Sequence, residues 1–288
     1  MLRVEPLTVT IGAELTGLDV RSLDGPLADR LYELLLDRAV LVLRDQHLTP
    51  AAHVALAESF GPLTDRHPLY PHVEGFPITR IVTDAAHPPE SEVWHSDLSC
   101  RPHPPFVSVL RAAELPPVGG DTLWADLRAV HDALPTDLRA ELALLEAEHT
   151  LEHGFRFLEA YGQADRSNAL ARTDRSENAA VHPVIVRHPA TGRSIVYVND
   201  SFTTRLLGGD ASRSTRLLAD LVEMVRNPRF QVRVRWRPGT VVIWDNWATQ
   251  HFAVGDYFPD HAREVQRVTV AADRRSRPFG GTVEALSH

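Results

Sequence analysis

Apolar residues recur at helical spacing in three stretches of the chain, and a capping pair predicts a fourth helix. Leucines at this spacing in 27–35 predict one amphipathic helix, and the Thr49-Pro50 pair, a capping residue before a proline suited to a first turn, predicts the start of a second. Residues 137–146 and 217–225 show the same spacing and predict two more. We expect the first two helices to lie on the outside of a sheet.

Most of the remaining apolar residues fall in short β-branched or alternating runs, which are typical of strands. These runs are 41–43, 78–83, 106–110, 194–198, 230–236, 240–244 and 265–270. Many strands and few helices predict a mainly β fold with bracing helices, either a barrel or a sandwich. The polar stretch from about Ala160 to Ala180 is long for a connection, so we interpret it as a mobile loop of the kind that closes over active sites.

The composition and net charge of the 288-residue chain exclude several classes of function. No repeat or linker interrupts the chain, which predicts one domain, and no apolar run approaches the ~20 residues that span a bilayer, so we expect no membrane partner. The N-terminus lacks a secretory pattern and Cys100 is the only cysteine, which together indicate a cytoplasmic protein. A net charge of -8 argues against nucleic acid and leaves a small molecule as the expected partner.

A possible metal site begins at His95-Ser96-Asp97. In a strand, alternation would place His95 and Asp97 on the same face. A distant histidine, His251, follows an apolar strand and would reach them from the opposite side of a barrel. Two histidines and one carboxylate form the facial triad of non-haem Fe(II) oxygenases. The chain has 15 histidines, so a surface or core histidine is the alternative for so short a motif.

An arginine pair gives this motif its context. Arg263 and Arg267 would share one face of a strand with Val265 and Thr269, while Glu264 and Gln266 would face the other way. Arginines inside a barrel are costly unless anions enter it, whereas arginines on an exposed edge strand would simply be solvated. With the upstream motif, we interpret the pair as holding a dicarboxylate and an anionic substrate.

Several segments together resemble the taurine and 2-oxoglutarate dioxygenase family along nearly the whole chain. They are FGPL (60–63), HPLYPH (67–72), WHSDLS (94–99), GGDTLWAD (119–126), HPVIVRHPATG (182–192), VNDSFTTR (198–205) and WDNWATQH (244–251). The resemblance implies a double-stranded β-helix, a jelly roll of cupin-like form. It also implies one dioxygenase domain over 1–288, active-site loops inserted at about 64–92 and 155–181, and a homo-oligomer, either a dimer or a tetramer.

The resemblance assigns roles to individual residues. It implies that His95, Asp97 and His251 hold Fe(II), and that Thr122 and Arg263 bind the distal carboxylate of 2-oxoglutarate. The glycines before Thr122 would let its hydroxyl approach this co-substrate, although a simple turn is the alternative. For Trp124 two interpretations stay open, a wall of the iron pocket or an ordinary core residue. The positions implied to contact the substrate are His67, Tyr70, Ser91, Phe155, Phe202 and Arg267.

The implied reaction consumes Fe(II)-bound 2-oxoglutarate and O2 and hydroxylates a carbon next to an anionic group. A taurine-like sulfonate would give an aldehyde and sulfite, with succinate and CO2. An alkyl sulfate ester, an aryloxy-carboxylate or a natural-product precursor is the alternative. Ser91 and Gly154 stand where enzymes of taurine usually carry asparagine and serine, and Gly154 would enlarge the pocket for a longer substrate.

Two alternatives from other classes remain at this point. One is a jelly-roll module that binds an anion without oxidising it, and the other is a zinc hydrolase, since two histidines and an aspartate also suit Zn(II). Neither needs a clamp for a dicarboxylate, so Arg263 and Thr122 argue against both.

Overall fold

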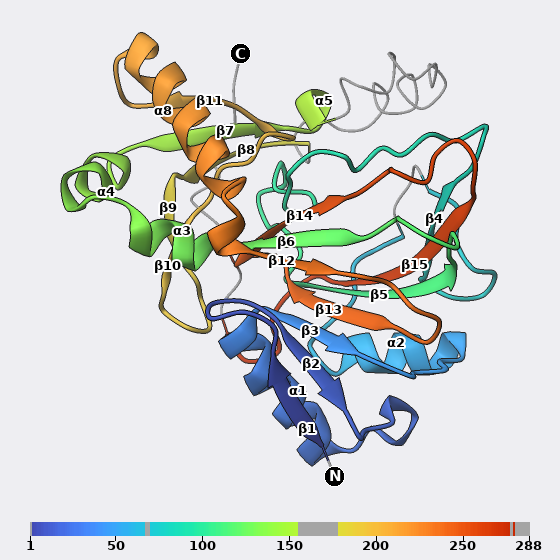
Figure 1. Cartoon of the computed structure of the whole chain (residues 1–288). Coiled ribbons are helices and arrows are strands. Elements are labelled where there is room, and N and C mark those ends of the chain that lie inside the picture. The colour runs from blue at the N-terminus through green and yellow to red at the C-terminus, as the bar shows by residue number, and fades with distance from the viewer. Residues whose placement is uncertain (1, 67–69, 155–177, 277–278, 280–288) are drawn as a thin grey trace.

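Two facing β-sheets form the centre of the molecule in this computed structural model, which describes residues 2–66, 70–154, 178–276 and 279. Within these ranges, a seven-stranded sheet lies below a three-stranded sheet in the view of Figure 1. The larger sheet has the order β1 (Arg3–Pro6), β2 (Ala13–Thr16), β3 (Val40–Leu43), β13 (Val241–Asp245), β5 (Val107–Glu114), β15 (Arg263–Val270) and β4 (Thr79–Thr83). The smaller has the order β12 (Gln231–Val234), β6 (Thr122–Asp126) and β14 (Thr249–Ala253).

The alternation of side chains along the strands divides the core into two layers. On β13, Val242 and Trp244 pack with Trp124 and Val232 of the smaller sheet, so they lie between the sheets. Their neighbours Val241 and Ile243 belong to the apolar cluster that includes the leucines of the first two helices. The larger sheet is therefore buried on both faces along this strand.

Two helices cover the outer face of the larger sheet, as predicted. The first, α1 (Gly25–Arg38), is capped by Asp24, and the second, α2 (Pro50–Glu58), by Thr49, whose hydroxyl accepts a hydrogen bond from Ala52 N at 3.2 Å. Ala39, with φ 61°, follows the last residue of α1 as its C-cap, and the chain then enters β3 directly. Figure 1 shows both helices below the sheet.

A second group of elements lies at the other end of the sandwich. It contains a three-stranded sheet of β11 (Thr203–Leu207), β7 (Glu146–Thr150) and β8 (Ala179–Pro183), and a hairpin of β9 (Ile185–Arg187) and β10 (Ser194–Val196). The helices here are α3 (Leu127–Ala133), α4 (Thr136–Leu142), α5 (Leu151–Gly154) and α8 (Ala211–Val225). Among the described residues, the short 3-10 turns are η1 (Val20–Ser22) and η3 (Pro228–Phe230). The predicted helix over 217–225 is confirmed as the second half of α8.

The helix predicted over residues 137–146 is wrong beyond Leu142. Three successive turn hydrogen bonds end α4, and Glu146 already begins β7. In β7, Ala147 and His149 are buried and their neighbours are more exposed, because the strand pairs with β8 and β11. Tertiary pairing therefore overrides the helical propensity of this alanine- and leucine-rich segment.

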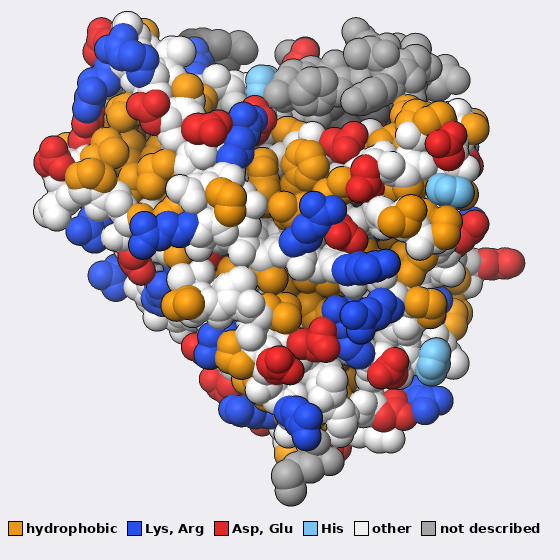
Figure 2. Space-filling view, viewed as in Figure 1, with side chains coloured by type: hydrophobic (Ala, Val, Ile, Leu, Met, Phe, Trp, Pro, Cys, Tyr) orange, Lys and Arg blue, Asp and Glu red, His pale blue; other side chains and the backbone are white. Residues whose placement is uncertain are grey.

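All seven predicted strands are present, as β3, β4, β5, β10, β12, β13 and β15. The predicted loop at 160–180 lies, as far as residue 177, outside the described residues, and so do His67 and Phe155. In the described ranges, no helix has the length and apolar character that crossing a membrane requires. On the face drawn in Figure 2, acidic and basic side chains are interspersed.

Candidate active site

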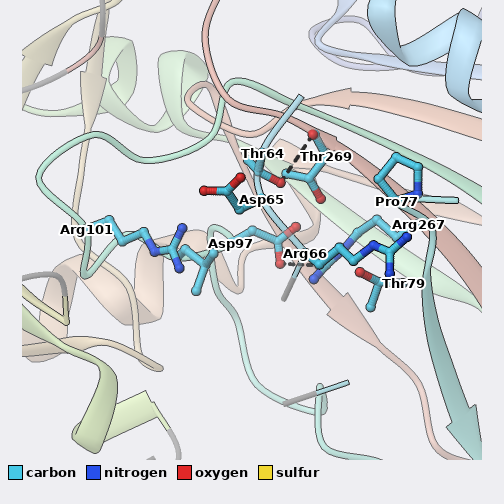
Figure 3. A pocket seen from close by; sticks show the side chains of 10 residues that line it. Thr64, Asp65, Arg66, Pro77, Thr79, Asp97, Arg101, Arg267 and Thr269 are labelled. Atoms are coloured by element: carbon cyan, nitrogen blue, oxygen red, sulfur yellow. Dashed lines mark hydrogen bonds and ion pairs between the residues drawn. The ribbon is translucent and has the colours of Figure 1, made fainter. Parts of the chain in front are cut away.

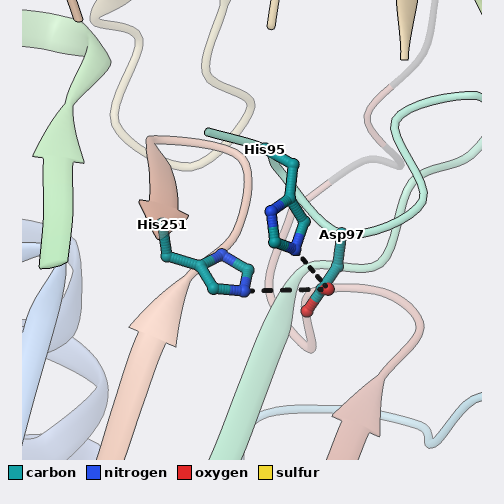
Figure 4. A group of neighbouring side chains, drawn as sticks. All are labelled: His95, Asp97 and His251. Carbon is teal, nitrogen blue, oxygen red and sulfur yellow. Dashed lines mark ion pairs between the residues drawn. The ribbon is translucent and has the colours of Figure 1, made fainter. Parts of the chain in front are cut away.

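Three buried side chains meet at one end of the space between the sheets. His95, Asp97 and His251 each offer one ligand atom, and these atoms lie within 4.8 Å of one another. Asp97 Oδ1 is 3.7 Å from His95 Nε2 and 4.0 Å from His251 Nε2. Figure 4 shows both imidazoles directed at the Asp97 carboxylate. The sequence motif and the distant histidine are thus brought together as predicted.

The route by which they meet differs from the prediction in two respects. His95 and Asp97 do not lie on a strand. In this segment a single antiparallel bridge joins His95 to His251, and the backbone turns at Leu98, which has φ 50°. His251 also does not come from the opposite side. It lies on β14, and its backbone exchanges two hydrogen bonds with that of His95, at 3.2 and 2.8 Å.

Backbone and ring contacts orient the two imidazoles. His95 Nδ1 lies 2.8 Å from Val93 O, and because a carbonyl only accepts, Nδ1 carries the proton and Nε2 keeps a lone pair. The His251 ring stacks on Trp124, its cross-strand partner, with 6.4 Å between ring centroids. Trp124 is therefore a fully buried core residue that also supports one wall of the site.

Asp97 is held by two residues that the sequence analysis did not single out. The Asn246 side chain accepts a hydrogen bond from Asp97 N at 2.7 Å and donates to Asp97 O at 3.0 Å. Ser108 donates to Asp97 Oδ2 at 3.1 Å, which leaves Oδ1 toward the histidines. Asn246 falls in the WDNWATQH segment, and Ser108 interrupts the apolar strand β5, so both carried a signal in the sequence.

A guanidinium shares the Oδ1 atom of Asp97. Arg267 Nη1 donates to this oxygen at 2.7 Å, and both side chains are nearly buried. Burial alone would raise the pKa of Asp97, but the positive charge of Arg267 and the hydrogen bond from Ser108 oppose this effect, and the pKa lies below its usual value. Burial lowers the pKa of both histidines, so they are neutral near pH 7 and able to donate electron pairs.

The three side chains fit a divalent metal ion. Three ligand atoms on one face of an octahedral ion, each about 2.1 Å from it, lie about 3 Å apart, so the separations of 3.7 and 4.0 Å from Oδ1 would shorten by about 1 Å around a bound ion. Two neutral imidazole nitrogens and one carboxylate oxygen are the donor set of non-haem Fe(II) oxygenases. The ionised aspartate supplies the charge that the neutral histidines do not.

Arg263 extends into the same interior from β15. This strand lies between β5 and β4, so the alternative of an exposed edge strand is wrong. Arg263 is 6% exposed, and its Nε and Nη2 atoms have no hydrogen-bond partner among the described residues. Burial lowers the pKa of Arg263, against the opposing effect of Tyr257. Glu264 and Gln266 hydrogen-bond to each other at 2.7 Å on the opposite face, as the alternation predicted.

Thr122 reaches Arg263 through an aromatic ring. The Thr122 hydroxyl accepts a hydrogen bond from Trp236 Nε1 at 3.0 Å, and the Arg263 guanidinium lies 5.7 Å from the centre of the Trp236 ring. Gly119 and Gly120 have φ of 85° and 70°, a left-handed backbone that favours glycine. A Cβ on Gly120 would lie only 3.2 Å from Arg263 Cδ, so this turn and Arg263 are closely packed.

The predicted substrate residues are only partly brought together. Phe202 lies edge-on to the His95 ring, with 6.4 Å between centroids, and Arg267 contacts Asp97. Ser91 lies beside β14, where its carbonyl accepts from Ala253 N at 3.0 Å. The Tyr70 hydroxyl donates to Glu90 at 2.9 Å. His67 and Phe155 lie outside the described residues.

The expectation that Gly154 enlarges the pocket is wrong. A Cβ built on Gly154 would lie 2.2 Å from Phe202 Cε1, so the Phe202 ring already fills the space that a side chain would take. Phe202 packs there with Cys100, Leu151 and Leu98. The absence of a side chain at Gly154 therefore allows the Phe202 ring to occupy this space.

Comparisons with known proteins agree with this geometry. The chain matches the model of the taurine catabolism dioxygenase TauD, TfdA family over residues 3–269. An alkylsulfatase from Acinetobacter baylyi is 34% identical over 275 residues, which cover 94% of this chain and 86% of the relative. An alpha-ketoglutarate-dependent sulfate ester dioxygenase from Pseudomonas putida is 33% identical over 280 residues, covering 94% and 90%.

A solved structure extends the likeness to the fold. A taurine dioxygenase from Burkholderia xenovorans has a TM-score of 0.79 and 32% identity to this chain, covering 98% of this chain and 96% of that one. This confirms the predicted double-stranded β-helix with bracing helices. The chain therefore belongs to the taurine catabolism dioxygenase TauD, TfdA family, and it is a dioxygenase that uses Fe(II), 2-oxoglutarate and O2.

Proposed function

We propose that His95, Asp97 and His251 hold the Fe(II) and that Arg263 and Thr122 bind the distal carboxylate of 2-oxoglutarate. The observation that carries this proposal is the buried Arg263 guanidinium, which has unpaired N–H groups in the same interior as the triad. Leaving such groups unpaired is costly, and a carboxylate would supply the missing acceptors. The dioxygenase class removes the need for the zinc-hydrolase and non-catalytic alternatives.

When bound, Fe(II), 2-oxoglutarate and O2 together supply the oxidising chemistry that places a hydroxyl on the substrate and leaves succinate and CO2. The protein residues bind the substrate and orient it beside the triad. Arg267 fixes an anionic group of the substrate next to the triad, and Phe202 forms an apolar wall beside His95. Trp124 and Trp244 close the interior behind His251 and exclude water there.

The proposed substrate is a small organic molecule with a sulfur oxyanion, either an alkyl sulfate ester or a sulfonate. The alkylsulfatase and sulfate ester dioxygenase relatives support the ester, and the taurine dioxygenase structure supports the sulfonate. Hydroxylation of the carbon that bears a sulfate ester oxygen gives a product whose C–O bond to sulfate breaks, releasing sulfate and an aldehyde. The same step on a sulfonate breaks the C–S bond and releases sulfite.

Three further expectations belong to this proposal. The chain would act as a single catalytic domain over 1–288, in the cytoplasm, and as a homo-oligomer, either a dimer or a tetramer. They are supported by the family resemblance along almost the entire chain. Size-exclusion chromatography with light scattering of the full chain would test the last of them.

The test of the site is an anaerobic titration of Fe(II) and 2-oxoglutarate into metal-free protein, followed by visible absorption. We expect the metal-to-ligand charge-transfer band of chelated 2-oxoglutarate, and we expect Asp97→Ala to abolish it. Addition of O2 with hexyl sulfate or taurine is then expected to give succinate and an equal amount of sulfate or sulfite. A wild-type protein that binds iron without the band would contradict the proposed site. A band without product from any sulfur oxyanion would contradict the substrate class alone.

A further inference from the structure

Three arginines surround a pocket beside the proposed iron ligand Asp97. Its charged lining residues are Arg66, Arg101, Arg267, Asp65 and Asp97, and the threonines Thr64, Thr79 and Thr269 also line it. Figure 3 shows Arg101 extending toward Asp97 from the side opposite to Arg267. Arg66 is exposed, whereas Arg101 and Arg267 are partly buried. The pocket thus presents two inner guanidinium groups.

The charge of Arg101 is not compensated within the described part of the chain. Arg267 pairs with Asp97, but no carboxylate is paired with Arg101 in the described ranges. The Nε atom of Arg101 is buried and has no hydrogen-bond partner there. A buried N–H without an acceptor costs free energy, so an anion entering the pocket would recover it.

The backbone of Arg101 is held rigidly at this place. Arg101 N donates to Leu98 O at 3.0 Å, which closes the turn after Asp97. The buried His182 Nε2 lies 3.1 Å from Arg101 O and 3.0 Å from Ser99 O, and since carbonyls only accept, it donates to both. Arg101 and Asp97 are therefore positioned by one and the same turn, four residues apart.

A count of charges leaves two guanidinium groups for the substrate. On the proposed function, the charges of Fe(II), Asp97, doubly ionised 2-oxoglutarate and Arg263 cancel, and so do those of the exposed pair Asp65 and Arg66 in the pocket lining. The positive charges of Arg101 and Arg267 remain. One guanidinium pairs with both oxygens of a planar carboxylate, whereas a sulfonate or sulfate ester has three terminal oxygens and keeps an acceptor for a second guanidinium.

We propose that Arg101 is a second anion-binding residue of the substrate site, which binds the sulfur oxyanion together with Arg267 and makes the enzyme prefer it over a carboxylate. This rests on the proposed function and deepens it, because it names the residue that distinguishes the two kinds of anion. Arg101 touches the substrate head in this proposal and has no part in holding iron or 2-oxoglutarate.

The test measures binding without turnover. Protein loaded anaerobically with Fe(II) and 2-oxoglutarate is titrated by calorimetry with hexyl sulfate and, separately, with heptanoate, a carboxylate with a similar tail. We expect Arg101→Gln to weaken binding of hexyl sulfate by about 10- to 100-fold, the range for one charge-assisted contact, and to change heptanoate binding little. Arg193→Gln, on the distant β9–β10 hairpin and paired with exposed Asp132, is the matched control and is expected to change neither.

Two results would overturn the proposal. Unchanged affinity of Arg101→Gln for hexyl sulfate would show that Arg101 does not contact the head, and an equal loss for both anions would show that it does not discriminate between them. The charge-transfer band of Arg101→Gln verifies that the variant is folded and holds its cofactors. Failure of the proposed substrate class is separate, because wild-type protein itself would then neither bind hexyl sulfate nor form succinate with it.

Discussion

At the scale of single residues, the most informative side chain is Arg263. It is 6% exposed, and two of its nitrogens have no acceptor in the described ranges. Its neighbours are an aromatic ring, Trp236, and the close turn at Gly120. A folded chain tolerates such a group when its function requires it.

We expect Arg263→Gln to raise KM for 2-oxoglutarate by about 10- to 100-fold, because a charge-assisted pair contributes roughly 1.5–3 kcal/mol. Fe(II) affinity is expected to change little, since Arg263 does not contact the triad. The matched control is Arg80→Gln on the neighbouring strand, whose guanidinium pairs with Glu264 on the other face of β15. Succinate formation at varied 2-oxoglutarate gives KM, and an unchanged value for Arg263→Gln would reject the clamp.

Gly154 leads to a second prediction at this scale. Its backbone is not left-handed, so only the 2.2 Å approach of Phe202 Cε1 opposes a side chain. We expect Gly154→Ser to lower the free energy of unfolding by about 1–3 kcal/mol through overpacking. The double variant Gly154→Ser with Phe202→Leu is expected to recover most of this loss. Urea unfolding measures both, and Gly25→Ser, which has no neighbour within 4 Å, is the control.

The sequence predicted which residues form the site better than it predicted which neighbours surround them. His95, Asp97 and His251 cluster as expected because the donor types themselves restrict what they do. The Gly154 prediction failed because it considered a missing side chain and not the neighbour that moves into the space. Arg101 was missed because its burial and lack of a partner depend on segments distant in the sequence, such as that of His182.

At the scale of elements, the turn after β13 positions the loop that carries Asp97. Asn246 is fully buried there and makes hydrogen bonds to Asp97 N, Asp97 O and Pro105 O, at 2.7, 3.0 and 2.9 Å. Ser96 adds a hydrogen bond to Thr249 O at 2.7 Å. An irregular loop is thus fixed by side chains in place of a strand ladder.

We expect Asn246→Ala to weaken metal binding by about 10- to 100-fold, the range for residues that orient a ligand from behind. Calorimetry with Mn(II) in place of Fe(II) measures this affinity without oxidation. Asn227→Ala, which removes only an exposed cap contact to Arg229 N, is the control and should bind Mn(II) normally. Wild-type affinity in Asn246→Ala would mean that the loop holds its shape without this side chain.

Element type was predictable where local pattern and tertiary environment agree. Strands such as β3 and β13 are buried on both faces and appear in the sequence as continuous apolar runs. The strands that were missed, including β2, β7 and β14, have charged or polar residues within four or five positions. Their pairing comes from partners far along the chain, as β14 with β6, and a local pattern does not carry that information.

At the scale of the whole molecule, closure of the two sheets brings together residues that lie far apart in the sequence. The triad joins residues 95 and 251 through a single backbone bridge, and β15 places both arginines beside it. Several histidines outside the triad are buried as neutral groups in this framework. Burial lowers the pKa of His53 and of His182 to about 4 in each case.

These buried histidines make stability depend on pH with a definite sign. Each folded pKa lies below the usual 6.5, so the unfolded chain binds more protons between pH 6.5 and 4. The free energy of unfolding is therefore constant with respect to these groups above pH 6.5, and it falls as the pH drops from 6.5 to the folded pKa of about 4. A shift of this size corresponds to about 3 kcal/mol at pH 4 for each histidine.

Replacement of His53 by glutamine isolates one of these contributions. We expect His53→Gln to flatten the fall in unfolding free energy between pH 7 and pH 4 by up to about 3 kcal/mol, because the glutamine amide can still donate to Val109 O without titrating. Urea unfolding of metal-free protein at several pH values gives the slopes. His47→Gln, at an exposed position, is the control and should keep the wild-type slope. Equal slopes for all three proteins would show that His53 is already protonated, or accessible to water, in the folded chain.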